Sequence, residues 1–370
     1  MNHSVFYISL SLDKGHYGGS IVAKGNLNAL RSKSALRTIA FSVHRNPIDS
    51  AVKIPTTNNR LGTALANLLL MCATLGPTGF LQLLRVIKKE QPDLVWLDSS
   101  LFGILIPFIR LVSKRTKVVC FFHNIESDLV REYARDNPFY WISYLATKAN
   151  EHLSAKYADK VVTIQKQDGE RLKKKYSLES YSCISATIND INPSVENNME
   201  GDFNEDLNVR YALFVGSDFA PNIEALKFLN NEIAPNLLRT KIIAVGNGID
   251  KYRNEFTNVA IKGRVDQIAP FYRNALVIVA PLFSGGGMKV KIAEALMFNK
   301  GVIASTFGSI GYENVESPII QVIDEPYEFA KRLDEYDLDL GQKPREYYLK
   351  YFSPKSAESS LGKIIDDLLT

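Results

Sequence analysis

Short apolar runs alternate with longer segments of helical spacing along most of the chain. In the first half, the apolar runs predict strands at residues 5–10, 36–43, 93–97, 117–122 and 160–164. The segments between them predict helices at 21–32, 61–89 and 146–157, the second of which is broken at Gly76-Pro77. Near-continuous apolar strands that alternate with helices are typical of a parallel sheet covered on both faces.

The same alternation starts again after residue 210. It predicts strands at 211–215, 241–245, 259–262, 276–280, 302–305 and 319–322, with helices at 221–229, 268–274, 287–298 and 327–336. We therefore expect two doubly wound α/β domains, at 1–190 and 210–345, joined by a polar linker at 191–209. The tail, 346–370, is expected to be largely helical and able to pack back on the first domain.

The composition is that of an ordinary globular protein, with 46% hydrophobic and 23% charged residues. Cys72, Cys120 and Cys183 are odd in number and widely spaced, which favours reduced thiols and a cytoplasmic location. No secretory leader, no uninterrupted membrane span and no metal-ligand spacing is visible in the sequence.

The charge is distributed unevenly. Residues 1–150 hold 18 Lys and Arg against 9 Asp and Glu, a balance of +9, whereas residues 151–370 hold 26 against 31, a balance of −5. A basic first half suits an anionic phospholipid surface or a diphosphate-linked acceptor, although such an imbalance can also serve solubility alone. The apolar stretches 61–87 and 102–112 are either core helices or a membrane-facing surface. No nucleic-acid partner is expected, because the basic residues are spread out and form no recognition motif.

The segment 283–301 carries the most informative chemistry. Three glycines, Gly285 to Gly287, follow a predicted strand and open a predicted helix that contains Lys289, Lys291 and Glu294. A helix N-terminus presents unpaired N–H groups, glycine allows close backbone approach, and lysine adds charge, so this arrangement can bind a phosphate. Glu294 shares a helix face with Lys291 and can accept hydrogen bonds from two sugar hydroxyls. A tight turn followed by a surface ion pair is the alternative interpretation.

Residues 261–313 resemble the donor-nucleotide region of retaining glycosyltransferases of the GT-B fold, family 4 (glycosyl transferases group 1). The matching pieces are Gly263 to Asp266, Tyr272 to Ala275, Pro281, the glycine loop, Glu294-Ala295 and the strand 301–305. In the first half, His16 to Ser20 and Phe121 to Glu126 resemble the glycine loop and the strand-end histidine segment of such enzymes. The resemblance implies two Rossmann-like domains that face each other across a cleft.

The resemblance also implies a role for each matching residue. His123, Lys291 and Glu294 would be catalytic, with His123 at the donor sugar and Glu294 on the ribose. The donor nucleotide would be bound by Gly216, Arg264, Val265, Gly285, Gly286, Gly287, Met288, Lys289, Lys291 and Glu294. The acceptor or phosphate loop would use Gly18, Gly19 and Glu126. The donor is expected to be a UDP or GDP sugar and the acceptor a glycan or lipid-linked oligosaccharide, with no metal required.

Two departures from the family pattern bear on the identity of the donor sugar rather than on the reaction class. Gly286 stands where the common form has a second acid, and the loop 216–222 lacks the usual Arg and Lys. A retaining transferase acting in surface polysaccharide synthesis at the inner face of the cytoplasmic membrane is the expected function. A nucleotide-sugar epimerase of the same fold and an inactive nucleotide-sugar-binding subunit are the alternatives.

Overall fold

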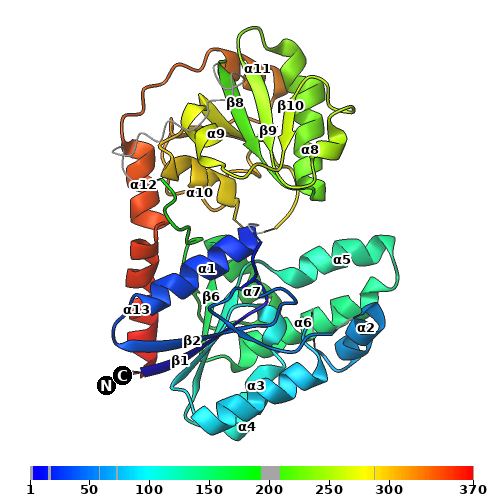
Figure 1. The fold of residues 1–370 in the computed structure, drawn as a ribbon, viewed down its shortest axis with the longest axis vertical. Coiled ribbons are helices and arrows are strands. Elements are labelled where there is room, and N and C mark those ends of the chain that lie inside the picture. Colours follow the sequence, from blue (N-terminus) through cyan, green and yellow to red (C-terminus); the bar gives the residue numbers. More distant parts are fainter. Residues whose placement is uncertain are drawn as a thin grey trace. The chain divides into compact units, whose positions relative to one another are not determined.

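The structure is a computed structural model that describes residues 3–15, 18–57, 59–71, 74–192, 209–286 and 288–369 (Figure 1). It divides into two compact units. The first comprises Met1–Thr187, Gly286–Met288 and Pro354–Thr370, and the second comprises Ile188–Gly285 and Lys289–Ser353. Most of the predicted linker, together with Cys72 and Gly287, lies outside the described residues.

The first unit is built on a parallel sheet. Within the described residues it has seven strands in the order β3-β2-β1-β4-β5-β6-β7. The strands are β1 (His3–Ser9), β2 (Leu36–Ser42), β3 (Val52–Lys53), β4 (Leu94–Leu97), β5 (Lys117–Phe122), β6 (Lys160–Thr163) and β7 (Ser182–Cys183). Strand order reverses between β1 and β4, which pair in register from Val5 with Leu94. The five predicted strands are confirmed to within two residues, whereas β3 and β7 are too short to give a periodic signal.

The helices of this unit are α1 (Gly18–Arg31), α2 (Arg60–Leu68), α3 (Pro77–Glu90), α4 (Leu105–Val112), α5 (Glu126–Asp136), α6 (Tyr140–Tyr157), α7 (Lys166–Tyr176) and α13 (Pro354–Leu369). The predicted break at Gly76-Pro77 is confirmed, because Pro77 takes the first position of α3, where its missing N–H costs nothing. Prediction placed the start of α1 three residues too late, since Gly18 already lies in its first turn.

The second unit repeats this architecture with a parallel sheet in the order β10-β9-β8-β11-β12-β13. Its strands are β8 (Tyr211–Val215), β9 (Lys241–Val245), β10 (Ala260–Gly263), β11 (Val277–Ala280), β12 (Val302–Ala304) and β13 (Ile320–Val322). All six predicted strands are confirmed to within one residue. The helices are α8 (Ala220–Phe228), α9 (Ala269–Asn274), α10 (Val290–Met297), α11 (Pro326–Asp334) and α12 (Lys343–Tyr351). The fold class is therefore α/β with two Rossmann-like domains, as predicted.

Each unit has its own hydrophobic core on the faces of its sheet. Every residue of β4 and β11 is fully buried, as expected for central parallel strands covered on both sides. Burying one large aliphatic or aromatic side chain contributes about 1.5–3 kcal/mol, so these strands anchor the loops that leave their carboxyl ends. The last helix, α13, packs against α1 within the first unit.

Candidate functional site

The carboxyl end of the second sheet has a point where the strand order reverses, between β8 and β11. The chain proceeds from β8 to β9 and β10 on one side and from β11 to β12 and β13 on the other. Connections that leave two neighbouring strands in opposite directions open a crevice, in which doubly wound sheets bind their ligands. Here the loops are 216–219, after β8, and the described residues 281–286 and 288–289, after β11.

Glu294 lies in the second turn of α10 and is buried, with 9% of its surface exposed. Its Oε2 accepts a hydrogen bond of 2.7 Å from the hydroxyl of Tyr272 on α9. The Tyr272 ring in turn stacks on Phe298, with ring centroids 4.9 Å apart. Burial raises the pKa of Glu294, and the Tyr272 hydrogen bond and nearby Lys291 oppose that rise. The carboxylate is thus held in one orientation by a rigid, buried partner.

Lys291 joins α10 to the element that follows β8. Its Nζ donates a hydrogen bond of 3.0 Å to Oδ1 of Asn222 on α8 and lies 4.3 Å from the ring centroid of Phe214 on β8. Burial lowers the pKa of Lys291 to about 7, Glu294 opposes this shift, and Lys289 adds to it. The ammonium charge is therefore sensitive to any anion that binds beside it.

A tyrosine hydroxyl is inserted into the first turn of α10. Tyr312 donates a hydrogen bond of 2.7 Å to the carbonyl of Lys289 and accepts one of 3.1 Å from the N–H of Ala293. This hydroxyl bridges two groups that would otherwise pair directly four residues apart in the helix. The Lys289 ammonium lies 4.5 Å from the ring centroid of Phe307. Tyr312 thereby fixes the backbone that carries both lysines.

The predicted start of this helix at residue 287 is wrong. The helix begins at Val290, with Lys289 as its N-cap, so the glycines precede its first turn. Gly285 has φ of +102°, a conformation that favours glycine, and Met288 is buried. The helical N–H groups nearest the lysines are consequently those of Val290 and Lys291, whereas Gly287 lies outside the described residues.

The other predicted donor residues lie at the same edge of the sheet. Gly216 follows β8, and a Cβ there would stand 2.7 Å from Cγ of Asn222, so the position has no room for a side chain. Arg264 and Val265 follow β10, two strands away from β8, and Arg264 is exposed. The described residues thus bring Gly216, Lys291 and Glu294 to the reversal point and place Arg264 further along the edge.

The first unit carries a histidine–aspartate pair at its own carboxyl edge. Nε2 of His123, which follows β5, lies 3.1 Å from the carbonyl oxygen and 3.3 Å from Oδ2 of Asp98, which follows β4. Both partners are acceptors, so Nε2 carries a proton and Nδ1 is the remaining ring nitrogen. Ser9 Oγ donates to the same Oδ2 at 2.8 Å. Burial alone would lower the pKa of His123, but the Asp98 carboxylate outweighs it and the pKa is raised.

Glu126 opens α5 close to this pair. Burial raises its pKa to about 7; the charge of His123 opposes the rise and that of Glu151 adds to it. Glu151, on α6, is fully buried and accepts hydrogen bonds from the backbone N–H and hydroxyl of Ser127 and from the hydroxyl of Tyr176 at 2.6 Å. These bonds fix the N-terminus of α5 and hence the position of Glu126.

Gly18 and Gly19 form the first turn of α1, directly after β1 at the strand reversal of the first sheet. His16 and Tyr17, which precede them, lie outside the described residues. The side chain of Asp13 anchors the loop, since its Oδ1 accepts a hydrogen bond of 2.5 Å from the N–H of Gly15. The two glycines therefore stand at the crevice position expected from the strand order.

Several site residues were missed by the sequence analysis. Asp98 follows an apolar strand next to the strand of His123, and this strand-end position was a usable signal. Asn222 and Tyr312 carried no such signal in the sequence. Asn222 contacts Lys291 from 69 positions away, and Tyr312 contacts the backbone of α10 from 19 to 23 positions away. Tyr272 belonged to a matched pattern but had no assigned partner.

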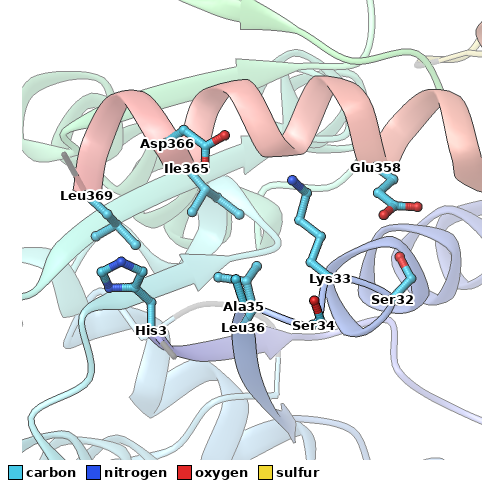
Figure 2. A pocket seen from close by; sticks show the side chains of 10 residues that line it. All are labelled: His3, Ser32, Lys33, Ser34, Ala35, Leu36, Glu358, Ile365, Asp366 and Leu369. Atoms are coloured by element: carbon cyan, nitrogen blue, oxygen red, sulfur yellow. The ribbon is translucent and has the colours of Figure 1, made fainter. Parts of the chain in front are cut away.

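The first unit has a pocket of about 330 Å³ away from the carboxyl edge of its sheet. Figure 2 shows the residues that line it. The pocket lies between α13 and the amino ends of β1 and β2, where Lys33 points toward α13. Within the described ranges, no group of three or more His, Cys, Asp or Glu side chains is placed to hold a metal ion. A bilayer-crossing helix, judged by length and apolar character, is likewise not found in the described part of the chain.

A family model matches much of the second unit. Residues 209–336 match the family model for glycosyl transferases group 1. No curated protein sequence matches the chain at a significant level. Many solved structures match the fold.

Among them is HepE from Anabaena in complex with UDP-glucose, with 11% identity, a TM-score of 0.69 and coverage of 98% of this chain and 99% of that chain. The lipopolysaccharide outer core galactosyltransferase WaaB has 12% identity, a TM-score of 0.65 and coverage of 98% and 99%. A putative UDP-N-acetylglucosamine 2-epimerase from Listeria monocytogenes has 13% identity, a TM-score of 0.62 and coverage of 99% and 96%. The chain therefore has the GT-B fold, and residues 209–336 of its second unit match the model for glycosyl transferases group 1.

Proposed function

We propose that this chain is a retaining glycosyltransferase that moves a sugar from a UDP or GDP sugar to a glycan or lipid-linked oligosaccharide. We place this reaction in surface polysaccharide synthesis, at the inner face of the cytoplasmic membrane. The observation that carries the proposal is the cluster of half-buried Lys291 with buried Glu294 and Tyr272 at the strand reversal of the second sheet. It falls inside the segment that matches the family model.

The cluster suits a nucleoside diphosphate. Lys289 and Lys291 would neutralise the diphosphate, and the negative charge that develops on its β-phosphate in the transition state would strengthen the attraction. Glu294 would accept hydrogen bonds from the two ribose hydroxyls. Because Tyr272 already donates to Oε2, Oε1 keeps its lone pairs for the ribose. With two lysines supplying positive charge, we propose that the donor site needs no metal ion.

The proposed reaction keeps the anomeric configuration. The acceptor oxygen forms a bond to the anomeric carbon on the face from which the nucleoside diphosphate leaves. The bond between that carbon and the β-phosphate oxygen breaks, and the β-phosphate takes the acceptor proton. In this scheme no carboxylate base is required, and His123 orients a sugar hydroxyl through the nitrogen that Asp98 does not occupy. Gly18, Gly19 and Glu126 would contact the acceptor or its phosphate.

The proposal is tested first by ligand binding. A thermal-shift screen against nucleotides and nucleotide sugars should raise the melting temperature for one base, because a bound ligand stabilises the folded state by RT ln(1 + [L]/Kd). The chosen donor is then incubated with glycan and lipid-linked acceptors, and the anomeric coupling constant of the product is measured by NMR. A product of inverted configuration would contradict retention.

The epimerase alternative is favoured by the fold likeness to the putative epimerase from Listeria monocytogenes. It predicts that the free donor changes configuration without any acceptor, which the same NMR experiment detects. Gly286 counts against it, because an epimerase of this type needs carboxylates near the sugar. An inactive binding subunit would instead show the thermal shift without transfer, hydrolysis or epimerisation.

A further inference from the structure

The second unit has a hollow of about 550 Å³ between α8 and the short helix η5 (Asp250–Tyr252), which follows β9. This volume is within the range of small-molecule sites, which is about 300–1,000 Å³. The side chains around the hollow come from the loop after β8, from α8 and from η5, and they are Asp218, Ala220, Ile223, Glu224, Lys227 and Tyr252. None of them belongs to the cluster around Lys291 and Glu294.

Helices α8 and α10 lie on opposite faces of the second sheet. The chain crosses from β8 to β9 in one direction and from β11 to β12 in the other. Crossovers between parallel strands are right-handed, so opposite directions place their helices on opposite faces. Glu294 lies on α10, so the hollow beside α8 is separate from the proposed ribose site. It still adjoins the glycine loop, because Oγ of Ser284 donates a hydrogen bond of 2.6 Å to Oε2 of Glu224.

Part of the lining is apolar and rigid. Ile223 and Tyr252 are half-buried and pack against the hydrophobic core of the second unit, and Ala220 is exposed beside them at the start of α8. The ring of Tyr252 stacks on buried Phe256, with ring centroids 5.5 Å apart and an interplanar angle of 20°. A ligand with C–H groups on its faces can therefore remove apolar surface from water here without reorganising the protein.

The rest of the lining is polar and already oriented. Oδ2 of Asp218 accepts a hydrogen bond of 2.6 Å from Nζ of Lys251, and its Oδ1 accepts one of 3.1 Å from the hydroxyl of Tyr252. The hydrogen bond from Lys251 lowers the pKa of Asp218, so this carboxylate stays ionised at neutral pH. Each carboxylate oxygen can accept a second hydrogen bond, Glu224 adds a second carboxylate, and Lys227 adds three donors.

The charges around the hollow cancel. Asp218 and Glu224 are matched by Lys227 and by Lys251, the partner of Asp218. An anion such as a nucleoside diphosphate would meet two carboxylates, and a divalent cation would meet two ammonium groups. A neutral molecule rich in hydroxyls suits this set, because its hydroxyls both donate to carboxylates and accept from lysine.

We infer that this hollow binds a neutral saccharide, at a site separate from the catalytic centre. A sugar ring combines apolar C–H faces with a rim of hydroxyls, which matches the apolar and polar parts of the lining. The inference rests on the proposed function for the origin of the saccharide, which is the glycan that the enzyme extends. A second contact with that glycan would raise the effective concentration of the acceptor at the catalytic centre.

Hydrogen-exchange mass spectrometry without nucleotide locates the site. The probes are neutral disaccharides of glucose, galactose, mannose and N-acetylglucosamine: maltose, lactose, mannobiose and chitobiose. At least one of them should slow exchange in peptides that cover residues 218–228 and 249–256, because a bound ligand suppresses local opening. Protection confined to other segments, or no protection by any of the four, would overturn the inference.

Two variants test the lining itself, with affinities for the protecting disaccharide measured by saturation-transfer NMR. Ala220→Trp fills the hollow from an exposed position and should abolish binding. Lys227→Ala should weaken binding about tenfold, which is the lower end of the range for one hydrogen bond to a charged group. The matched controls are Leu238→Trp and Lys331→Ala, both exposed elsewhere in the second unit, which should bind as the wild type does. Undiminished binding by both Ala220→Trp and Lys227→Ala would refute the site.

The competing occupant is the donor nucleotide. In that case Ala220→Trp would abolish the thermal shift by nucleotides, and a nucleotide would displace the disaccharide, which would overturn the saccharide assignment. A disaccharide with a uronic acid that binds more tightly than its neutral parent, and loses this advantage in salt, would overturn the assignment to a neutral ligand. Saccharide binding is measured without nucleotide, so its failure leaves the donor thermal shift untouched, and failure of the donor screen leaves saccharide binding untouched.

Discussion

Replacement of Glu294 by alanine tests the proposed role of this carboxylate in holding the nucleotide ribose. Glu294 is buried and oriented by Tyr272, so ribose hydroxyls would meet a preorganised acceptor. A hydrogen bond to a charged group contributes about 1.5–3 kcal/mol, and two such bonds are not fully additive. We therefore expect a loss of about 3 kcal/mol, which corresponds to a roughly 150-fold weaker nucleoside diphosphate.

The decisive comparison changes the ligand as well as the protein. The wild-type protein and Glu294→Ala are each titrated calorimetrically with the nucleoside diphosphate and with its 2′,3′-dideoxy analogue. If Glu294 binds the ribose diol, the variant loses affinity for the parent nucleotide but binds the dideoxy analogue about as well as the wild type does. The coupling between the two changes is then the measured quantity.

Tyr272→Phe serves as the matched control. It removes one hydrogen bond from a buried carboxylate and should cost about 1–3 kcal/mol of stability, while both ribose contacts remain possible. The coupling free energy between Tyr272→Phe and removal of the two ribose hydroxyls should therefore be small. Equal losses on both ligands for Glu294→Ala, or no loss on either, would refute the assignment of the ribose to this acid.

Two further predictions concern the charged pairs. Nucleotide affinity should fall as pH rises above about 7, because the diphosphate favours the ammonium form of Lys291, whose pKa burial lowers to about 7. Calorimetry should show a loss of about 15-fold between about pH 7 and 8.5, which Lys291→Arg should flatten, and a flat wild-type profile would contradict the site. Asp98→Asn should lower the pKa of His123 in an NMR titration, because burial then acts without the carboxylate. It should also reduce kcat with little change in the donor KM, whereas an unmoved histidine pKa would remove Asp98 from the mechanism.

The sheets could be predicted from sequence because central parallel strands are apolar on both faces. Runs such as 211–215 and 117–122 leave little choice of structure, and the strand-end rule then points to His123 and to the loop after residue 280 before any geometry is known. The place of each strand within the sheet could not be predicted in the same way. It is pairing between strands that puts Arg264 two strands away from β8.

What the sequence could not provide were the contacts that orient the site. The start of α10 at Val290 was misplaced by three residues, and nothing local to residues 287–298 signals the hydroxyl of Tyr312, which reaches the first turn from a later loop. The hydrogen bond from Tyr272 to Glu294 and that from Lys291 to Asn222 are tertiary in the same sense. Residue types at a strand end predict chemistry, whereas orientation depends on partners that only folding brings together.

The two units use a buried acid beside a cation in opposite ways. Asp98 raises the pKa of His123 in spite of burial, so the imidazole has its counter-charge within the protein. Burial outweighs Glu294 at Lys291, whose pKa falls to about 7 and whose charge therefore depends on what binds. A sugar hydroxyl brings no charge, so Asp98 would remain the counter-ion of His123 when a sugar binds. A diphosphate brings negative charge, so its binding would favour the charged ammonium form of Lys291. The opposite pKa shifts thus suit the different ligands that we propose for each half.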